Sequence, residues 1–258
     1  MDKKIATWNV NSLKVRLPHV LNWITQNEPD ILALQEIKLQ DADFPLAALT
    51  QVGYQAICSG QKTYNGVAIL SKHNAQDIVT DIPNLVDPQR RILIATIDGI
   101  RLINLYVPNG ESVTSEKYAY KLHWLREITA YIKEEIAKHE KIVILGDFNI
   151  APEARDVHNP QAWEGQVLCS EPERRALTEL MGISLQDTFR LFEQAEKSYT
   201  WWDYRALGFQ LNHGLRIDHI LVNSLMAKQC IRCVIDRSQR KLERPSDHAP
   251  VMATFNIT

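Results

Sequence analysis

Acidic and amide side chains directly follow several of the most apolar segments of this sequence. Asn9 follows Ile-Ala-Thr-Trp, Glu36 follows Ile-Leu-Ala-Leu-Gln, and Asp147 follows Ile-Val-Ile-Leu-Gly. Two further acids, Asp218 and Asp247, each precede a histidine. One such carboxylate is readily explained as a strand end or as the partner of an arginine, because an unpaired buried carboxylate is costly. Several carboxylates at matching positions are harder to explain separately, and they favour one shared positive charge.

A hard divalent cation would supply that charge. Oxygen ligands without a cluster of cysteine and histidine suit Mg²⁺ or Mn²⁺ rather than zinc. Mg²⁺ usually takes only one or two protein carboxylates and keeps its other positions for water and a phosphate substrate. We therefore expect some of these polar groups to hold Mg²⁺, with Mn²⁺ as the alternative, and the others to be free for chemistry.

Asp147, Asn149 and His248 are the candidates for that chemistry. Residues two apart in an extended segment face the same way, so Asp147 and Asn149 could address one water molecule together. The alternative is an ordinary Asx turn after a strand. A catalytic role for His248 is favoured because Asp218 ends a different apolar strand. A carboxylate can fix the tautomer or hold the charge of a histidine. His219 would point away from the Asp218 side chain, which favours a structural role.

The elements that must position these residues are short strands interspersed with helices. Eight short apolar segments rich in β-branched residues are predicted strands: 4–8, 31–35, 66–70, 92–97, 101–107, 141–145, 216–222 and 251–257. Their nearly continuous apolar character indicates strands covered on both faces. Helices are expected over residues 18–28 and 115–139, and after a capping-box pattern at 170–173. The pattern predicts helix-covered sheets, and the number of strands favours two packed sheets.

The helix at 115–139 shows the clearest periodicity. Leucine and isoleucine recur in it at steps of three and four residues. Its opposite face is expected to be polar and to carry Lys121, Glu127, Lys133 and Glu134.

Composition excludes several classes of protein. The chain has 258 residues, of which 45% are hydrophobic and 23% charged, so it is neither disordered, collagen-like nor a disulfide scaffold. The four cysteines are sparse and predict reduced thiols in the cytoplasm. No apolar run approaches the ~18 residues of a membrane span. No linker rich in proline, glycine and serine divides the chain, so we expect one domain over residues 1–258.

The net charge of −2 bears on any polyanionic partner. A protein that binds nucleic acid through bulk charge should be basic. A local patch or a metal must therefore meet the polyanion. Arg90-Arg91 and the basic run Arg237–Arg244 are the candidate patches, and a solvated charged surface is the alternative.

Nine segments of the chain together resemble the exonuclease III family of DNA-repair enzymes. This family includes the apurinic/apyrimidinic endonucleases and belongs to the endonuclease/exonuclease/phosphatase superfamily. GDFN with SDH is typical of the superfamily, whereas TWWDYR with GLRIDHIL narrows the match to enzymes similar to exonuclease III. In order between residues 7 and 251, the segments are TWNVNSL, LALQEIK, NGVAILSK, NLYVPNGES, SEKYAYKL, ILGDFNIAP, TWWDYR, GLRIDHIL and PSDHAPV.

The resemblance implies an α/β fold and a catalytic set. The fold would be a four-layer α/β sandwich, in which two packed mixed β-sheets are flanked by helices and the site lies at one edge. Glu36 matches the principal metal ligand, with Asn9 and Asp247 nearby. Five catalytic residues are implied. Asp147 would orient or deprotonate the attacking water, and Asn149 would assist it. His248 with Asp218 would bind and stabilise the phosphate, and Tyr106 would contact it.

The resemblance also implies substrate contacts. Asn109 matches a position that contacts phosphate. Trp201, Leu215 and Ile217 fall where relatives form a small apolar pocket for a sugar that lacks its base. Asn11 stands where some relatives carry aspartate, which leaves its part in metal binding open. Gln166 and Leu168 lie in a variable segment whose bulk could shift the preference from internal abasic sites towards damaged 3′ ends.

The expected function is therefore that of a Mg²⁺-dependent DNA-repair nuclease. It would hydrolyse phosphodiesters 5′ to abasic sites and remove 3′-terminal nucleotides or 3′-blocking groups from double-stranded DNA. We expect a cytoplasmic monomer that does not bind membranes. Two alternatives remain: a phosphatase of the same superfamily that acts on a small phosphoester, and a catalytically silent nucleic-acid-binding homologue.

Overall fold

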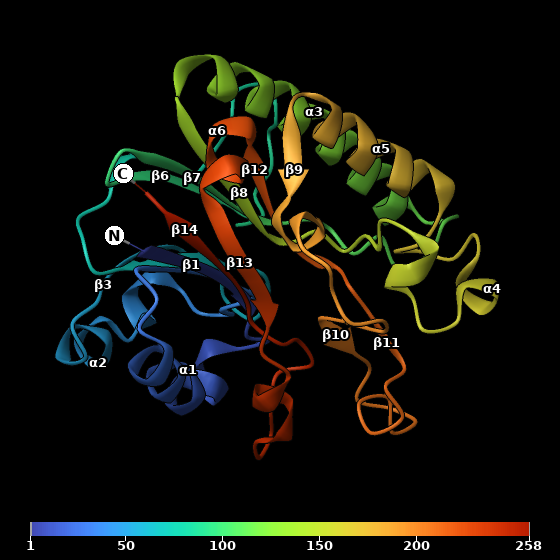
Figure 1. Cartoon of the computed structure of the whole chain (residues 1–258), viewed down its shortest axis with the longest axis horizontal. Coiled ribbons are helices and arrows are strands. Elements are labelled where there is room, and N and C mark those ends of the chain that lie inside the picture. The colour runs from blue at the N-terminus through green and yellow to red at the C-terminus, as the bar shows by residue number, and fades with distance from the viewer. Residues whose placement is uncertain (1, 258) are drawn as a thin grey trace.

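Two six-stranded sheets pack face to face in the computed structural model, which describes residues 2–257 (Figure 1). The first sheet has the order β13 (Cys230–Ile235), β14 (Val251–Asn256), β1 (Asp2–Asn9), β2 (Ile31–Gln35), β4 (Val67–Ser71) and β3 (Gln55–Ser59). The second has the order β5 (Gln76–Val79), β6 (Ile92–Ile97), β7 (Ile100–Tyr106), β8 (Lys141–Asp147), β12 (Asp218–Asn223) and β9 (Leu185–Asp187). Both sheets combine parallel and antiparallel pairs.

Helices cover the outer faces of the two sheets (Figure 1). On the first sheet lie α1 (Leu13–Asn27) and α2 (Leu46–Gln51), and on the second lie α3 (Glu116–Lys138) and α5 (Glu171–Gly182). The predicted four-layer α/β sandwich is therefore confirmed. The shorter elements are α4 (Pro160–Trp163), α6 (Ser224–Gln229), the ribbon of β10 (Trp201–Trp202) with β11 (Gly214–Leu215), and the 3₁₀ turns at Asp41–Asp43, Ala154–Asp156, Thr188–Leu191 and Arg237–Lys241.

Each central strand buries both of its faces, as its continuous apolar sequence predicts. In β8, Val143 and Leu145 pack between the sheets, whereas Ile142 and Ile144 pack under the helices of the second sheet. This follows from the period of two along a strand. The core therefore has three layers, one between the sheets and one beneath each helical cover.

The helices begin and end close to the predicted positions. The Ser115 side chain caps α3 by accepting a hydrogen bond from the backbone of Tyr118, and the capping box at Ser170 and Glu173 starts α5. The prediction for α1 was wrong at its start, because the helix begins at Leu13 and takes Pro18 into its exposed face.

The prediction of a polar position for Lys121 was also wrong. Its side chain is fully buried and paired with Glu173. Position 121 shares the helical stripe of Trp124, Leu125 and Ile128, which faces the core. The position of residue 121 on the core-facing side of the helix decides its burial, although lysine is a charged residue. Burial is possible because the ammonium group finds partners inside the protein.

The strands of both sheets end at one edge of the molecule, where most of the predicted site residues lie. In the second sheet, Tyr106 stands beside Asp147 and Asp147 stands beside Asp218 in the strand register. In the first sheet, Asn9 stands beside the last residue of β2, and Glu36 follows directly. The topology thus gathers side chains from distant segments.

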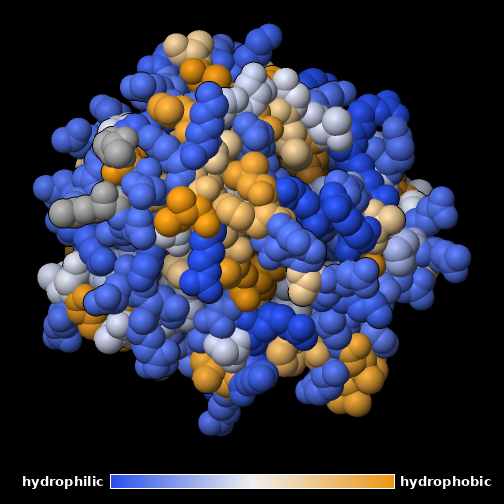
Figure 2. All heavy atoms as spheres, in the orientation of Figure 1, coloured by the Kyte–Doolittle hydropathy of each residue, from blue (hydrophilic) through white to orange (hydrophobic). Residues whose placement is uncertain are grey.

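In the part of the chain that the structure describes, no helix is both long and apolar enough to cross a bilayer. The face in Figure 2 is mostly hydrophilic, with apolar side chains gathered near its centre.

Candidate active site

Asn9 joins the two sheets at the site edge. Its amide NH₂ group donates to Glu36 Oε1 and to Asp147 Oδ2, both at 2.9 Å. Asn9 is completely buried, and its own amide oxygen accepts from the backbone of Asn11 at 3.0 Å. Asn9 therefore orients two carboxylates from different sheets, and its oxygen points away from them.

Asp147 and Asn149 form an Asx turn, the alternative interpretation of this pair, and the segment is not extended at Asn149. The backbone N–H of Asn149 donates to Asp147 Oδ1 at 2.9 Å, and its side-chain amide lies 3.3 Å from Asp147 Oδ2. Asn149 has a φ of 51°, in the left-handed region that asparagine tolerates. Gly146 is required before this turn, because a Cβ there would overlap the carbonyl oxygen of Leu105.

His248 lies between two carboxylates. Its Nδ1 is 2.9 Å from Asp218 Oδ2, and its Nε2 is 3.8 Å from Asp147 Oδ2. Burial alone would lower the pKa of His248, but the charges of Asp218 and Asp147 raise it to about 10. The ring is therefore a cation near neutral pH, held in place by Asp218 and directed at the Asp147 side of the site.

The pKa of Asp147 is raised, whereas a carboxylate paired with a cation ordinarily has a lowered pKa. Burial raises it to about 7, His248 opposes this rise, and the nearby charge of Asp218 adds to it. Near neutral pH a raised pKa makes Asp147 a proton acceptor of useful strength. Perturbed groups of this kind cluster at functional sites.

Tyr106 extends the site along β7. Burial, with the charge of Glu36 beside it, raises the pKa of Tyr106 well above its usual range, so the hydroxyl stays a neutral donor. The Arg91 guanidinium lies 4.6 Å from the centre of the Tyr106 ring and donates to its backbone carbonyl at 3.2 Å. Asn109, which is exposed, donates to Asn149 Oδ1 at 3.2 Å. Arg91 therefore supports a residue that faces the substrate space.

The chemistry of the donor set fits a hard divalent cation. Glu36, Asp147 and His248 each offer an atom within 4.8 Å of the others. His248 is held through Nδ1 by Asp218, and hard cations prefer oxygen to imidazole nitrogen, so the oxygens of Glu36 and Asp147 are the candidate ligands. Glu36 has a φ of 51°, a strained conformation that is typical of functional sites. Oxygen ligands from two carboxylates suit Mg²⁺ or Mn²⁺.

Lys38 is a neighbour of Glu36 that the sequence interpretation missed. Its Nζ lies 2.9 Å from Glu36 Oε2 and donates to Asn11 Oδ1 at 2.6 Å. No sequence signal pointed to it, because a lysine in a loop usually faces water. Lys38 supplies positive charge beside the carboxylate.

Asp247 has both carboxylate oxygens engaged in this structure. Oδ1 accepts from Asn11 Nδ2 and Oδ2 accepts from Trp201 Nε1, each at 3.0 Å. Asp247 thus connects the loop of Asn11 to the aromatic ring of Trp201. It lies beside the cluster of Glu36 and Asp147 rather than within it.

The three residues predicted to form the apolar pocket are brought together. Leu215 and Ile217 are buried in one small cluster, and the half-buried Trp201 packs against it. Leu168 belongs to the same cluster, whereas Gln166 is exposed. The neighbouring Trp202 is fully buried with Phe209 at 5.2 Å between ring centres, so it has a packing role.

The basic run at Arg237–Arg244 is partly structural. The Arg240 guanidinium is buried and lies 5.1 to 6.0 Å from the rings of Trp202, Tyr204 and Phe209. Arg237 also lies over Trp202, at 5.4 Å. These cation–π contacts hold the loop that follows β10. Lys241 and Arg244 remain exposed on this run.

A buried ion network supports the strand that carries the pocket. Arg216 lies between Leu215 and Ile217, and it pairs with Asp156 and Asp187, each at 2.7 Å. His219 completes the network with Nδ1 at 3.1 Å from Arg216, as expected for a structural histidine.

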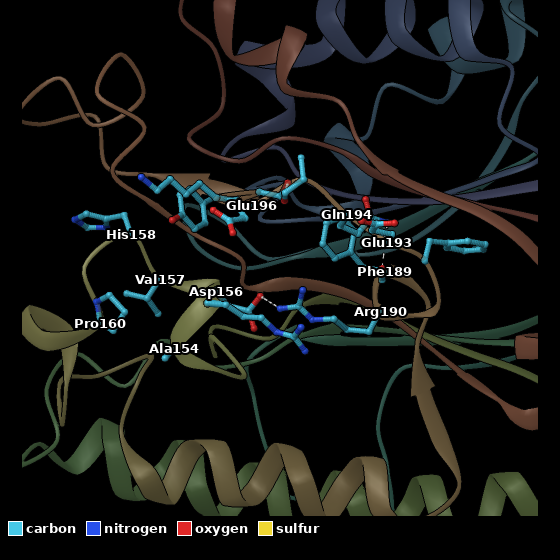
Figure 3. Close-up of a pocket in the computed structure, with 16 residues that line it drawn as sticks. Ala154, Asp156, Val157, His158, Pro160, Phe189, Arg190, Glu193, Gln194 and Glu196 are labelled. Atoms are coloured by element: carbon cyan, nitrogen blue, oxygen red, sulfur yellow. Dashed lines mark hydrogen bonds and ion pairs between the residues drawn. The ribbon is translucent and has the colours of Figure 1, made fainter.

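A cavity of about 650 Å³ lies beside this network, lined by residues 154–158, 160, 189–190 and 192–199 (Figure 3). Figure 3 shows Asp156 and Arg190 paired at its wall. The residues lining this cavity include none of the candidate catalytic or metal-binding residues. The ion network therefore has a structural role, and the cavity is separate from the candidate catalytic residues.

Replacing Arg216 by methionine is expected to lower the free energy of unfolding by about 3–5 kcal/mol, because Asp156 and Asp187 lose their buried partner. Burial alone would raise the pKa of Asp156, but Arg216 and Arg190 lower it below its usual value. The stabilisation from this carboxylate is therefore present above about pH 4 and is lost as the pH falls further. Urea unfolding at pH 7 and pH 3 measures both effects. Equal acid sensitivity in the variant and the wild type would contradict the assignment.

The fold and this site define a class of enzyme that acts on phosphoesters. The sequence matches the endonuclease/exonuclease/phosphatase family over residues 6–248, and the chain belongs to this family. It is 38% identical to exodeoxyribonuclease III of Haemophilus influenzae, with 98% of this chain and 99% of the relative covered. The predicted resemblance to enzymes of the exonuclease III kind is confirmed.

Solved structures agree with this placement. A form of the 3′ phosphatase NExo from Neisseria, bound to a product DNA hairpin, matches with a TM-score of 0.97 and 48% identity, over 99% of this chain and 100% of that one. An AP endonuclease from Archaeoglobus fulgidus matches with a TM-score of 0.95 and 38% identity, over 99% of this chain and 100% of that one.

Proposed function

We propose that this protein is a divalent-metal-dependent DNA-repair nuclease. It hydrolyses phosphodiesters 5′ to abasic sites and removes 3′-terminal nucleotides or 3′-blocking groups from duplex DNA. The observation that carries the proposal is the buried pair of Asp147 and His248, 3.8 Å apart, with Asp218 behind the histidine. A proton acceptor beside a fixed cation suits attack of water on a phosphate. The relatives named as exodeoxyribonuclease III, 3′ phosphatase and AP endonuclease support the substrate class.

The residues divide the work of hydrolysis. Asp147 aims a water molecule at the phosphorus and takes its proton. His248, Asn149 and Tyr106 donate to the oxygens on which negative charge develops. Such preorganised donors stabilise a transition state without reorganising. Mg²⁺, held by Glu36 and Asp147, would supply Lewis-acid stabilisation of the phosphate and the leaving oxygen.

Trp201, Leu215 and Ile217 support recognition of a sugar without its base. A small apolar slot excludes an intact nucleotide by its size and admits an abasic deoxyribose turned out of the helix. Turning out costs least where base pairing is already lost. We further propose that the chain acts as one catalytic unit, a monomer in the cytoplasm, with Mg²⁺ as its metal.

The proposed function is tested on one gel with three duplex substrates: an internal abasic site, a recessed 3′ end and a 3′-phosphate end. With Mg²⁺ we expect cleavage or trimming of at least one substrate, and with excess EDTA we expect none. A soluble phosphomonoester in parallel identifies a general phosphatase. The absence of any processed DNA with either Mg²⁺ or Mn²⁺ would rule out the nuclease and favour a silent DNA-binding homologue.

A further inference from the structure

Lys121 is a completely buried lysine directly behind the site. It extends from α3 with no exposed side-chain surface. Its Nζ donates to the backbone carbonyls of Asn149 at 2.7 Å and of Asn109 at 3.1 Å, and it lies 2.5 Å from Glu173 Oε1. An ammonium group has three N–H donors, and these three acceptors use them all. Lys121 therefore cannot contact the substrate and acts only through its partners.

The two carbonyls belong to the loops that carry Asn109 and Asn149. Asn149 is held at a φ of 51°, a conformation that costs energy outside glycine even though asparagine tolerates it. A hydrogen bond to its carbonyl fixes the direction of that peptide group. The side chain of Asn109 also donates to Asn149 Oδ1 at 3.2 Å, which links the two loops directly.

Glu173 anchors the lysine. Its carboxylate accepts from the backbone N–H groups of Leu168 and Ser170 at 3.0 and 3.1 Å, and also from the Ser170 hydroxyl. Glu173 is itself fully buried at the start of α5. The ammonium group thus ties the segment before α5 to both loops of the site.

We propose that Lys121 is a positioning residue that sets the geometry of Asn109 and Asn149 through their backbone carbonyls. This inference rests on the proposed function, in which Asn149 donates to the phosphate in the transition state. A displacement of about 1 Å in such a group can cost on the order of 10²-fold in rate. The loss should fall on kcat rather than on KM, because the contact strengthens as charge develops.

The test compares Lys121→Met with a matched variant that breaks a different buried ion pair of the same helix. Arg101 of β7 pairs with Glu135 of α3 at 2.7 Å, and both side chains are nearly buried. Arg101→Met therefore also breaks a buried ion pair of α3, and the hydrogen-bond partners of Arg101, which are Glu135, Asp77 and Thr96, are not residues of the site. We expect K121M to lower kcat at least about 10-fold with KM within about 3-fold. R101M should lose a similar amount of thermal stability and keep kcat near the wild-type value. Equal losses of kcat in the two variants would overturn the proposal.

A double variant separates geometry from folding. In K121M/E173Q, both charges are removed, and the glutamine amide oxygen can still accept from the backbone at the start of α5. We expect its melting temperature to recover towards that of the wild type while kcat stays low. Recovery of kcat together with stability would show that Lys121 has only a structural role.

A crystal structure of the double variant tests the same inference without activity. Asn149 should leave the left-handed region once its carbonyl loses the ammonium group, and an unchanged Asn149 would refute the positioning role. If the wild-type protein cleaves no DNA, the proposed nuclease function fails, whereas this structural comparison still decides the role of Lys121.

Discussion

Asp147→Asn is expected to lower the rate of DNA hydrolysis by at least about 10²–10³-fold. Asparagine keeps the shape of the side chain but cannot accept a proton. It also removes one of the two anionic ligands expected to hold the cation. Single-turnover cleavage of whichever duplex the wild type processes, at saturating Mg²⁺, measures the effect.

The fold should survive this change. Asp147 is buried with a pKa raised to about 7, so its negative charge is not stabilised by the folded protein at neutral pH. We therefore expect a wild-type circular dichroism spectrum from D147N. Asp98→Asn serves as a control, because Asp98 is partly exposed and pairs with Lys3 and His73, outside the site. A near-wild-type rate in purified D147N would remove Asp147 from the mechanism.

His248→Asn should cost about 10²–10³-fold in kcat, because the site loses a fixed cation and a donor to the developing charge. The neighbouring His219 provides a demanding control. It is equally buried but points away, with Nε2 2.9 Å from the carbonyl of Ile150 and a pKa that burial lowers. His219→Gln can keep that hydrogen bond and should retain most of the activity. An equal loss in both variants would indicate a general effect of replacing a buried histidine near the site.

The pH dependence of kcat tests the charge on His248. Asp218 raises the pKa of that ring, so Asp218→Asn should lower it and the cation should be lost at a lower pH. The alkaline limb of the D218N profile should therefore shift towards acid relative to the wild type. An unshifted limb would mean that another group controls it.

The central strands could be predicted from the sequence because they are apolar throughout. Each of them is buried on both faces, and this leaves an uninterrupted run of β-branched residues. The edge strands β3, β5 and β13 gave no such signal, since one face or more of each meets solvent. The two-residue strands β10 and β11 are fixed by tertiary contacts alone.

Much of the site could be anticipated because polar residues at the ends of apolar strands are costly without a purpose. Glu36, Asp147 and His248 are brought together as that argument requires. Lys38 and Lys121 could not be found this way, because lysine in a loop or on a helix usually faces water. The hydrogen bonds that commit Asp247 to Asn11 and Trp201 depend on loop packing, which no local pattern encodes.

The bridge that Asn9 makes between Glu36 and Asp147 has a consequence for how this protein tolerates change. Each sheet contributes only some of the reactive groups. The distance between the groups of one sheet and those of the other therefore depends on how the side chains between the two sheets pack. A repacked interior could preserve the melting temperature and still impair turnover by letting one layer slide over the other. Substitutions far from the phosphate, such as enlarging Ala33 or Ala253 in the central layer, would then act as remote adjustments of catalysis.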